Sequence, residues 1–202
     1  MIGRGLLLLD KSPDVIYCSP ALRCLQTAAT VRDLAAAPKA LLRVEPALFE
    51  NPHLYSSMPT LATREQREQF KVDEGYLPTP RFKDVFKRGE SIEEYNKRIR
   101  DVLLRIASTA EPVREEKKRK RVTALVVGHA STVDLAVGWL SGVPRKTTLP
   151  QLHRIGDRIP YCATLLFTRT GSVWNAVPDG IPPVTYRNFT NRVVHDFVFR
   201  PV

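Results

Sequence analysis

The 202-residue sequence predicts an α/β protein in three layers, in which a mostly parallel sheet is flanked by helices. Three observations support this class. Short β-type runs alternate with segments of helical spacing along the chain. The run Val122–Val127 is continuously apolar, as expected of a strand buried on both faces of a parallel sheet. Hydrophobic residues make up 43% and charged residues 26%, so we expect a single globular domain over residues 1–202.

The first part of the chain predicts two strands and the helix between them. Val15–Cys18 is a β-type run, and Pro20, which follows it, suits the first turn of a helix. Apolar residues then recur at helical spacing from Leu22 to Leu34. Leu41–Val44 predicts a second short strand.

Residues 51–90 predict an irregular insertion over the binding site. They are polar and contain four prolines, and only Thr60–Phe70 fits a short helix. A stretch of this length inside a compact domain is typical of a segment that shapes a binding site.

The second part of the chain returns to regular elements. Ser91–Glu94 has the pattern of a capping box and precedes an apolar stripe at spacings of three and four residues. The strand Val122–Val127 is followed by a predicted helix over Thr132–Leu140, which Gly142 ends. Two further β-type runs flank a turn and predict a hairpin, Ala163–Thr168 and Val173–Val177.

Three polar residues follow predicted strands, at the edge where open α/β sheets bind ligands. Arg23 falls in the first turn of the first predicted helix, where free backbone N–H groups and the helix dipole favour an anion, and a guanidinium adds a bidentate clamp for phosphate. His129 follows the apolar strand and precedes a helix. Glu50 follows the second strand and could supply a proton to a leaving group. Together they predict an anion site with an acid.

Four ordered motifs resemble the histidine phosphatase superfamily, which includes the phosphoglycerate mutases and acid phosphatases. The nearest branch is that of the UBASH3/STS suppressors of T-cell receptor signalling and the ecdysteroid-phosphate phosphatases. The motifs are SPALRCLQTA (Ser19–Ala28), VEPALFE (Val44–Glu50), VVGHAST (Val126–Thr132) and RIPYCA (Arg158–Ala163).

The resemblance implies a phosphoglycerate mutase-like fold and a phosphomonoester hydrolase. Arg23 would bind the phosphoryl oxygens, Glu50 would protonate the leaving group and His129 would stabilise the transferring group. The family uses no metal and no cofactor. The expected partner is a phosphorylated small molecule or a phosphoprotein, and family members often form homodimers.

The sequence departs from the family in one respect: none of its 202 residues form the hallmark Arg-His-Gly triplet, whose His becomes phosphorylated in the family. Met1–Cys18 resembles the segment just before the Ser-Pro-x-x-Arg motif, so we expect the first central strand to be missing and activity to be absent or severely impaired. The three histidines outside the motifs are expected on the surface: His53, His153 and His195. His129 could itself attack phosphate, but its stabilising role would then be vacant.

Two alternatives to an enzyme remain open. In the first, the same pocket serves as a non-catalytic phosphate-recognition or scaffold module.

The second alternative depends on charge. The net charge of +10 is partly concentrated in the basic run Arg114–Arg121, which predicts a solvated linker, and less strongly a nuclear-localisation signal or a nucleic-acid contact. A cysteine-dependent phosphatase needs five residues between its cysteine and its arginine, whereas four residues separate Cys18 from Arg23. Three scattered cysteines, no signal peptide and no apolar run near about 20 residues predict a cytoplasmic protein without a membrane span.

Overall fold

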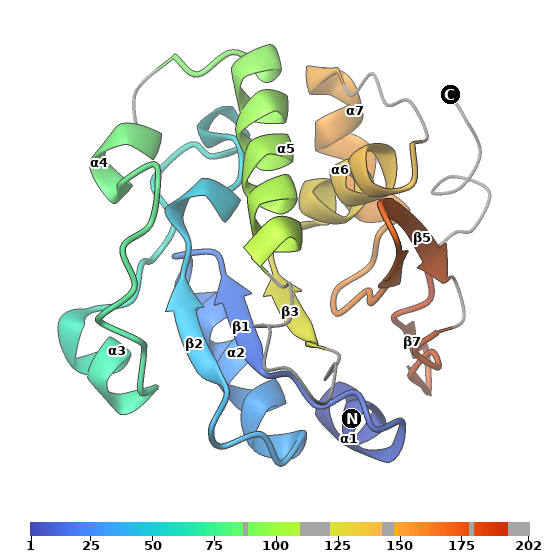
Figure 1. Ribbon diagram of the computed structural model, residues 1–202. Coiled ribbons are helices and arrows are strands. Elements are labelled where there is room, and N and C mark those ends of the chain that lie inside the picture. The colour runs from blue at the N-terminus through green and yellow to red at the C-terminus, as the bar shows by residue number, and fades with distance from the viewer. Residues whose placement is uncertain (87–88, 110–121, 143–147, 178–179, 194–202) are drawn as a thin grey trace.

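The computed structural model describes residues 1–86, 89–109, 122–142, 148–177 and 180–193 (Figure 1). Its centre is a three-stranded parallel sheet in the order β2-β1-β3, formed by β1 (Val15–Cys18), β2 (Leu41–Val44) and β3 (Ala124–Val127). Cys18 pairs with Val44 on one side and with Val127 on the other, so all three strands end at the same level. Residues that follow them in the sequence therefore meet at one edge.

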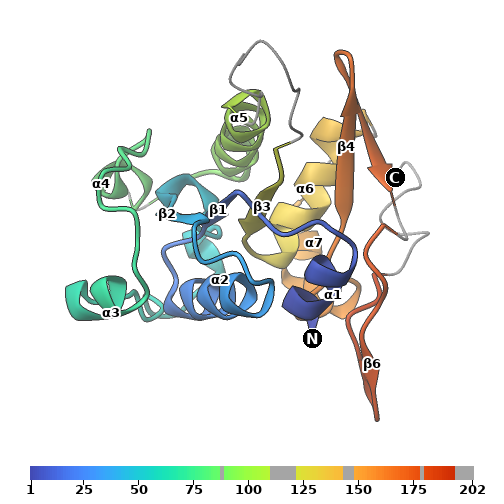
Figure 2. The same cartoon turned by 60° about the horizontal axis from the view of Figure 1, so that its bottom comes forward.

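Helices cover both faces of this sheet and give three layers, which confirms the predicted architecture (Figure 2). On one face, α1 (Ile2–Leu8) and α2 (Leu22–Leu34) enclose a core with the β1 side chains Ile16 and Cys18, neither of which is exposed. On the other face, a second core contains α5 (Ile92–Thr109) and α6 (Ala130–Leu140). The two cores together hold the sheet between the helical layers.

The predicted capping box begins α5. The Glu94 N–H donates to Ser91 Oγ at 3.2 Å, and the Ser91 N–H donates to Glu94 Oε2 at 2.8 Å. The periodicity predicts one apolar stripe on this helix. Its first residue, Ile92, is half-buried, and the others are buried: Tyr95, Ile99, Val102, Leu103 and Ile106.

Residues 46–90 contain short helical pieces joined by irregular chain. These pieces are η1 (Pro46–Leu48), η2 (Pro52–Leu54), α3 (Arg64–Gln69) and α4 (Phe82–Val85). The helix expected over Thr60–Phe70 is shorter in the structure because Thr63 forms a capping box with Gln66 and sets its start. Bridges from Leu61 to Ala21 and from Val72 to Leu42 attach the segment to the sheet and to the start of α2.

The C-terminal part forms α7 (Leu149–Arg154), η3 (Ile155–Asp157) and two hairpins, β4 (Leu166–Thr170) with β5 (Val173–Val177) and β6 (Thr185–Tyr186) with β7 (Phe189–Thr190). The first hairpin is the predicted one, but its first strand begins three residues later than expected. Cys162 adopts a left-handed backbone conformation, and its carbonyl accepts the Thr164 hydroxyl, so a turn occupies the start of the expected strand.

Two features of the sequence lie outside the described residues, namely the basic run Arg114–Arg121 and His195. Within the described ranges, no helix combines the length and the apolar character needed to cross a bilayer.

Candidate active site

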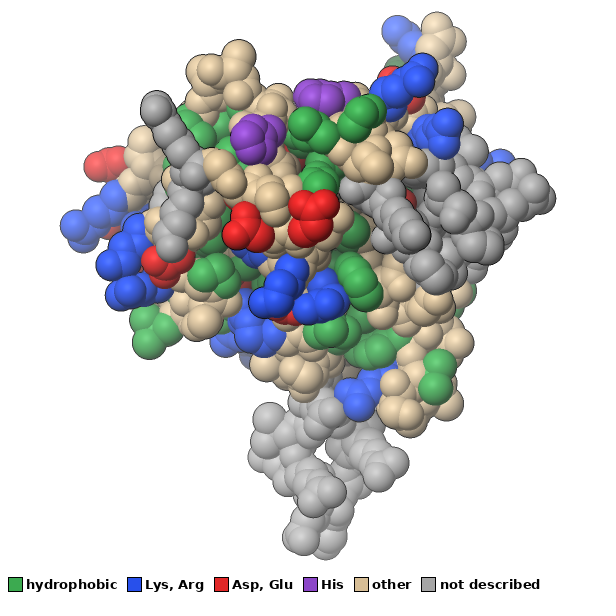
Figure 3. Space-filling model, turned by 90° about the horizontal axis from the view of Figure 1, so that it is seen from above, with side chains coloured by type: hydrophobic (Ala, Val, Ile, Leu, Met, Phe, Trp, Pro, Cys, Tyr) green, Lys and Arg blue, Asp and Glu red, His purple; other side chains and the backbone are tan. Residues whose placement is uncertain are grey.

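The structure brings Arg23, Glu50 and His129 together at the carboxyl edge of the sheet. Arg23 lies in the first turn of α2, Glu50 follows η1, and His129 is the N-cap residue of α6. Arg23 Nη2 is 3.0 Å from His129 Nδ1 and 3.4 Å from Glu50 Oε2, and the last two atoms are 3.3 Å apart. All three side chains line one hollow. Figure 3 shows the molecule from this side, where acidic and basic side chains gather near the middle.

The hydrogen bonds of His129 define which ring nitrogen carries the proton. Arg23 can only donate, so Nδ1 must accept its hydrogen bond. The neutral ring then has its proton on Nε2, which lies 2.8 Å from Ser19 Oγ and donates to it. Ser19 is the residue directly after β1, and it is fully buried. The serine therefore holds the imidazole in one tautomer.

His129 is neutral at pH 7 because its surroundings disfavour the imidazolium. Burial, followed by the positive charges of Arg23 and Arg98, lowers the pKa of His129 from 6.5 to about 3. Its contact with Glu50 is consequently not an ion pair. A dianion bound beside the ring would favour the imidazolium, so ligand binding and protonation of this residue are coupled.

Tyr55 completes the cluster, although no signal in the sequence predicts it. Its hydroxyl donates to Glu50 Oε2 at 2.6 Å and accepts from Arg23 Nη2 at 2.6 Å. The Tyr55 ring stacks on that of Phe49 at 5.9 Å between centroids. Burial, and then the hydrogen bond to Glu50, raise the pKa of Tyr55, so the phenol stays protonated. The residue lies in the irregular part of the chain, where no periodicity indicates which side chains turn inward.

Arg98 of α5 holds the segment that carries Glu50. Its Nη1 donates to the carbonyls of Ala47 and Phe49, at 2.8 Å each. The same guanidinium forms a bidentate ion pair with Glu90, at 2.6 and 2.7 Å. Both side chains are largely shielded from solvent, only 9% and 11% exposed. Arg98 directly precedes a buried residue of the apolar stripe, which places it at the edge of the buried face. An arginine at this position equally fits the exposed side of a helix, so the sequence alone does not predict its role.

Glu45, the other acid of the motif, belongs to a separate network. It is fully buried, and its Oε2 accepts hydrogen bonds from Tyr76 and Arg105. Its Oε1 accepts the Ala47 N–H at 3.1 Å and so caps η1. Burial, and then the bond to Glu45, raise the pKa of Tyr76 to about 12. Glu45 therefore shapes the turn before Glu50 and does not contact Arg23 or His129 through any of these bonds.

The cysteines near the cluster have the character of buried thiols. Cys18 is fully buried, and burial raises its pKa. Cys24 Sγ lies 4.0 Å from His129 Nε2, and burial raises its pKa to about 11. A nucleophilic cysteine needs a lowered pKa, so this environment disfavours the cysteine-dependent alternative.

The other histidines do not join the cluster where the structure describes them. His53 and His153 are exposed, on η2 and α7 respectively. Within the described ranges, no three His, Cys, Asp or Glu side chains are grouped closely enough to hold a metal ion.

The low pKa of His129 leads to a prediction about stability in acid. In the unfolded chain His129 takes up a proton at its ordinary pKa of 6.5, whereas in the folded protein it stays neutral down to a much lower pH. This contribution to stability is complete above pH 6.5 and declines as the pH falls towards the lowered pKa, by about 1.4 kcal/mol per pH unit. We therefore expect the free energy of unfolding of the wild type to fall by about 1.4 kcal/mol per pH unit more than that of His129→Asn. Urea unfolding at several acidic pH values measures both. Equal slopes for the two proteins would contradict the buried neutral imidazole.

The fold and the cluster together define an α/β protein with an arginine, a histidine and an acid at the carboxyl ends of a parallel sheet. Residues 5–160 match the histidine phosphatase superfamily (branch 1), and the chain belongs to this superfamily. The resemblance seen in the four sequence motifs is thus confirmed.

Individual relatives agree with this assignment. The ecdysteroid-phosphate phosphatase of Drosophila melanogaster is 32% identical over 192 residues, which cover 92% of this chain and 24% of that protein. Ubiquitin-associated and SH3 domain-containing protein B of Homo sapiens is 30% identical over 195 residues, covering 92% and 28%. The chain thus spans about a quarter of the length of these relatives.

A solved structure shows the same fold. The crystal structure of ecdysone phosphate phosphatase from Bombyx mori, in complex with tungstate, superposes with a TM-score of 0.66 at 26% identity. The match covers 93% of this chain and 71% of that one, and it confirms the predicted phosphoglycerate mutase-like fold class.

Proposed function

We propose that the Arg23–Glu50–His129 cluster binds the phosphoryl group of a phosphomonoester. The observation that supports this most strongly is the half-exposed guanidinium of Arg23 beside a buried, neutral imidazole in one hollow. Arg23 lies in the first turn of α2, so backbone N–H groups and the helix dipole add to its positive charge. A tetrahedral dianion suits such a set of donors.

Each side chain has a role in this proposal. Arg23 binds phosphoryl oxygens and exchanges its bond to the Tyr55 hydroxyl for one to the ligand. His129 accepts a proton as the dianion arrives and then donates to a phosphoryl oxygen. Glu50, with its carboxyl group 3.3 Å from the imidazole, supplies the proton for a leaving alkoxide. These roles agree with those that the family resemblance implies.

For turnover, we propose that these 202 residues alone are inactive or severely impaired. The family resemblance places the attacking histidine in an Arg-His-Gly triplet, and the sequence contains none. Positioning and charge neutralisation remain, but phosphoryl transfer also requires an attacking group in line with the leaving oxygen. The chain would then act as a phosphate-recognition module, with a phosphorylated small molecule or a phosphoprotein as its ligand.

Calorimetric titration with orthovanadate or inorganic phosphate tests the binding site. We expect measurable affinity for the wild type and a loss of about 30- to 100-fold in Arg23→Ala, because one charge-assisted hydrogen bond contributes about 1.5–3 kcal/mol. Arg64→Ala is the matched control, since Arg64 is an exposed arginine on α3 and should leave the affinity unchanged. Equal affinity of the wild type and Arg23→Ala would refute the proposed site.

A p-nitrophenyl phosphate assay separates recognition from catalysis. Negligible turnover by a protein that binds orthovanadate supports the recognition module. Robust, metal-independent turnover that His129→Ala abolishes would show that the chain is a competent phosphatase and would overturn the proposed inactivity.

A further inference from the structure

Tyr55 lies between the two opposite charges of the candidate site. Its hydroxyl accepts a hydrogen bond from Arg23 Nη2 and donates one to Glu50 Oε2, both at 2.6 Å. The direct distance from Arg23 Nη2 to Glu50 Oε2 is longer, at 3.4 Å. A close pair between a guanidinium and a carboxylate has a distance of about 2.7–2.9 Å. The guanidinium therefore makes its short hydrogen bond to the neutral phenol and not to the carboxylate.

The packing of the Tyr55 ring holds the hydroxyl in this position. The ring stacks on that of Phe49, with the centroids 5.9 Å apart and the planes inclined by 22°. Phe49 is fully buried and directly precedes Glu50 in the chain. The guanidinium carbon of Arg23 lies 5.8 Å from the centroid of the Tyr55 ring. The phenol is thus fixed by the same segment that carries the carboxylate, and the arginine approaches it from α2.

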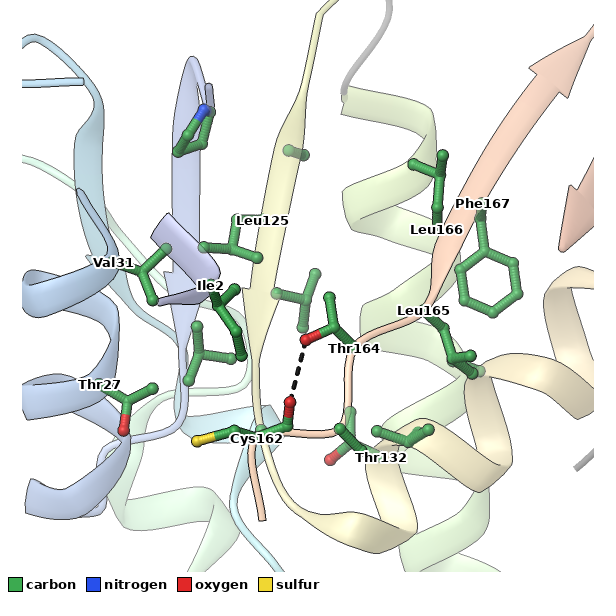
Figure 4. Close-up of a pocket in the computed structure, with 18 of the residues that line it drawn as sticks. Ile2, Thr27, Val31, Leu125, Thr132, Cys162, Thr164, Leu165, Leu166 and Phe167 are labelled. Atoms are coloured by element: carbon green, nitrogen blue, oxygen red, sulfur yellow. Dashed lines mark hydrogen bonds between the residues drawn. The ribbon is translucent and has the colours of Figure 1, made fainter. Parts of the chain in front are cut away.

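Arg23 keeps another edge of its guanidinium open to a ligand. Its Nη2 makes the contacts within the cluster, whereas over the described ranges no hydrogen bond involves its Nε or Nη1. Its side chain is 47% exposed and lines the hollow. Figure 4 shows part of this hollow, which is bordered by Thr27 and Thr132, one turn beyond Arg23 on α2 and beyond His129 on α6. A dianion in the hollow can therefore reach the guanidinium.

We infer that Tyr55 is a positioning residue of the proposed phosphate site, which keeps the Arg23 guanidinium from pairing directly with the Glu50 carboxylate. The inference rests on the proposed function, because it concerns binding of the same dianion. A hydrogen bond between two ions is stronger than one between an ion and a neutral phenol, so a dianion displaces the phenol from Arg23 more easily than it would displace a carboxylate. The phenol also donates to Glu50 and so reduces the repulsion between this carboxylate and the arriving dianion.

The variant Tyr55→Phe removes the hydroxyl and retains the ring that stacks on Phe49. Arg23 and Glu50 can then approach each other and form a direct ion pair. We expect the affinity for orthovanadate, measured by calorimetric titration, to fall by about tenfold, because the ligand must now break this pair. Tyr186→Phe is the matched control, since Tyr186 is 60% exposed on β6 and its hydroxyl should have no effect on the affinity.

Glu50→Gln separates this role from a purely structural one. Glutamine resembles glutamate in shape but has no charge, so the guanidinium gains no ion pair when the phenol is removed. In the Glu50→Gln background we expect Tyr55→Phe to change the orthovanadate affinity by less than about twofold, compared with about tenfold in the wild-type background. An equal loss in both backgrounds would mean that the hydroxyl acts through packing or binds the ligand itself, and would overturn the inference. Unchanged or higher affinity of Tyr55→Phe alone would also overturn it.

A second measurement needs no phosphate. Phenylglyoxal modifies arginine side chains, and an arginine held in an ion pair reacts more slowly because the pair favours its charged form. In the unliganded protein we expect Arg23 to react about threefold more slowly in Tyr55→Phe than in the wild type, and at the wild-type rate when Glu50→Gln is added. Mass spectrometry measures the rates, with the exposed Arg64 as the internal reference.

The two measurements distinguish failure of this inference from failure of the proposed function. A wild type that does not bind orthovanadate refutes the phosphate site, and the modification rates alone then decide whether Tyr55 keeps the two charges apart. Equal rates for Arg23 in the wild type and in Tyr55→Phe would overturn the inference, even if the wild type binds orthovanadate.

Discussion

Replacing Arg98 with methionine is expected to lower the free energy of unfolding by about 3–5 kcal/mol. The change leaves the buried carboxylate of Glu90 without its partner, and an uncompensated buried charge costs this much. It also removes the donors to the Ala47 and Phe49 carbonyls. Methionine approximates the length of the arginine stem, so the loss reflects charge and hydrogen bonding more than packing.

Lys97→Met is the matched control for this variant. Lys97 precedes Arg98 on the same helix, and its side chain is 70% exposed, so its removal should change stability by less than about 0.5 kcal/mol. Urea unfolding measures both. Because Arg98 holds the turn before Glu50, we also expect Arg98→Met to weaken orthovanadate binding at a temperature where it remains folded. A loss of stability no larger than that of Lys97→Met would contradict the buried ion pair.

The second large effect is expected at Arg105, which neutralises the fully buried Glu45. Arg105→Met should cost about 3 kcal/mol, because Tyr76 alone cannot compensate the carboxylate charge. Adding Glu45→Gln should then recover about 1 kcal/mol or more, since the amide is neutral and its oxygen can still accept the Ala47 N–H.

A double-mutant cycle measured by urea unfolding gives the interaction energy directly. We expect the double variant to be more stable than Arg105→Met alone. If the two single losses simply add, the network does not depend on the charge of Glu45, and the account of this turn fails.

The regular elements were predictable because their signals are local. The capping box of Ser91 and Glu94 and the stripe on α5 depend only on residues within one helix. The apolar run of β3 and the hairpin of β4 and β5 depend on alternation and a turn. Only their limits differ, where a local turn at Cys162 or a cap at Thr63 sets the boundary.

Part of the candidate site was predictable for a topological reason. Parallel strands end at one edge, so residues that follow β1, β2 and β3 in the sequence converge there. This places Arg23, Glu50 and His129 together without knowledge of their exact contacts. Tyr55 was not predictable in this way, since it reaches the cluster from irregular chain whose path depends on contacts with α2 and β2.

The sequence by itself determined the order of strands and helices, the superfamily motifs and the three polar residues at strand ends, because each follows from neighbours in the chain. Only the tertiary structure decided that Glu45 is structural, that Arg98 anchors the turn before Glu50 and that His129 is neutral. These properties depend on burial and on charges brought together from distant segments, such as Arg23 and Arg98 around one imidazole. Desolvation and Coulomb interactions act through space, so periodicity and spacing along a chain do not contain them.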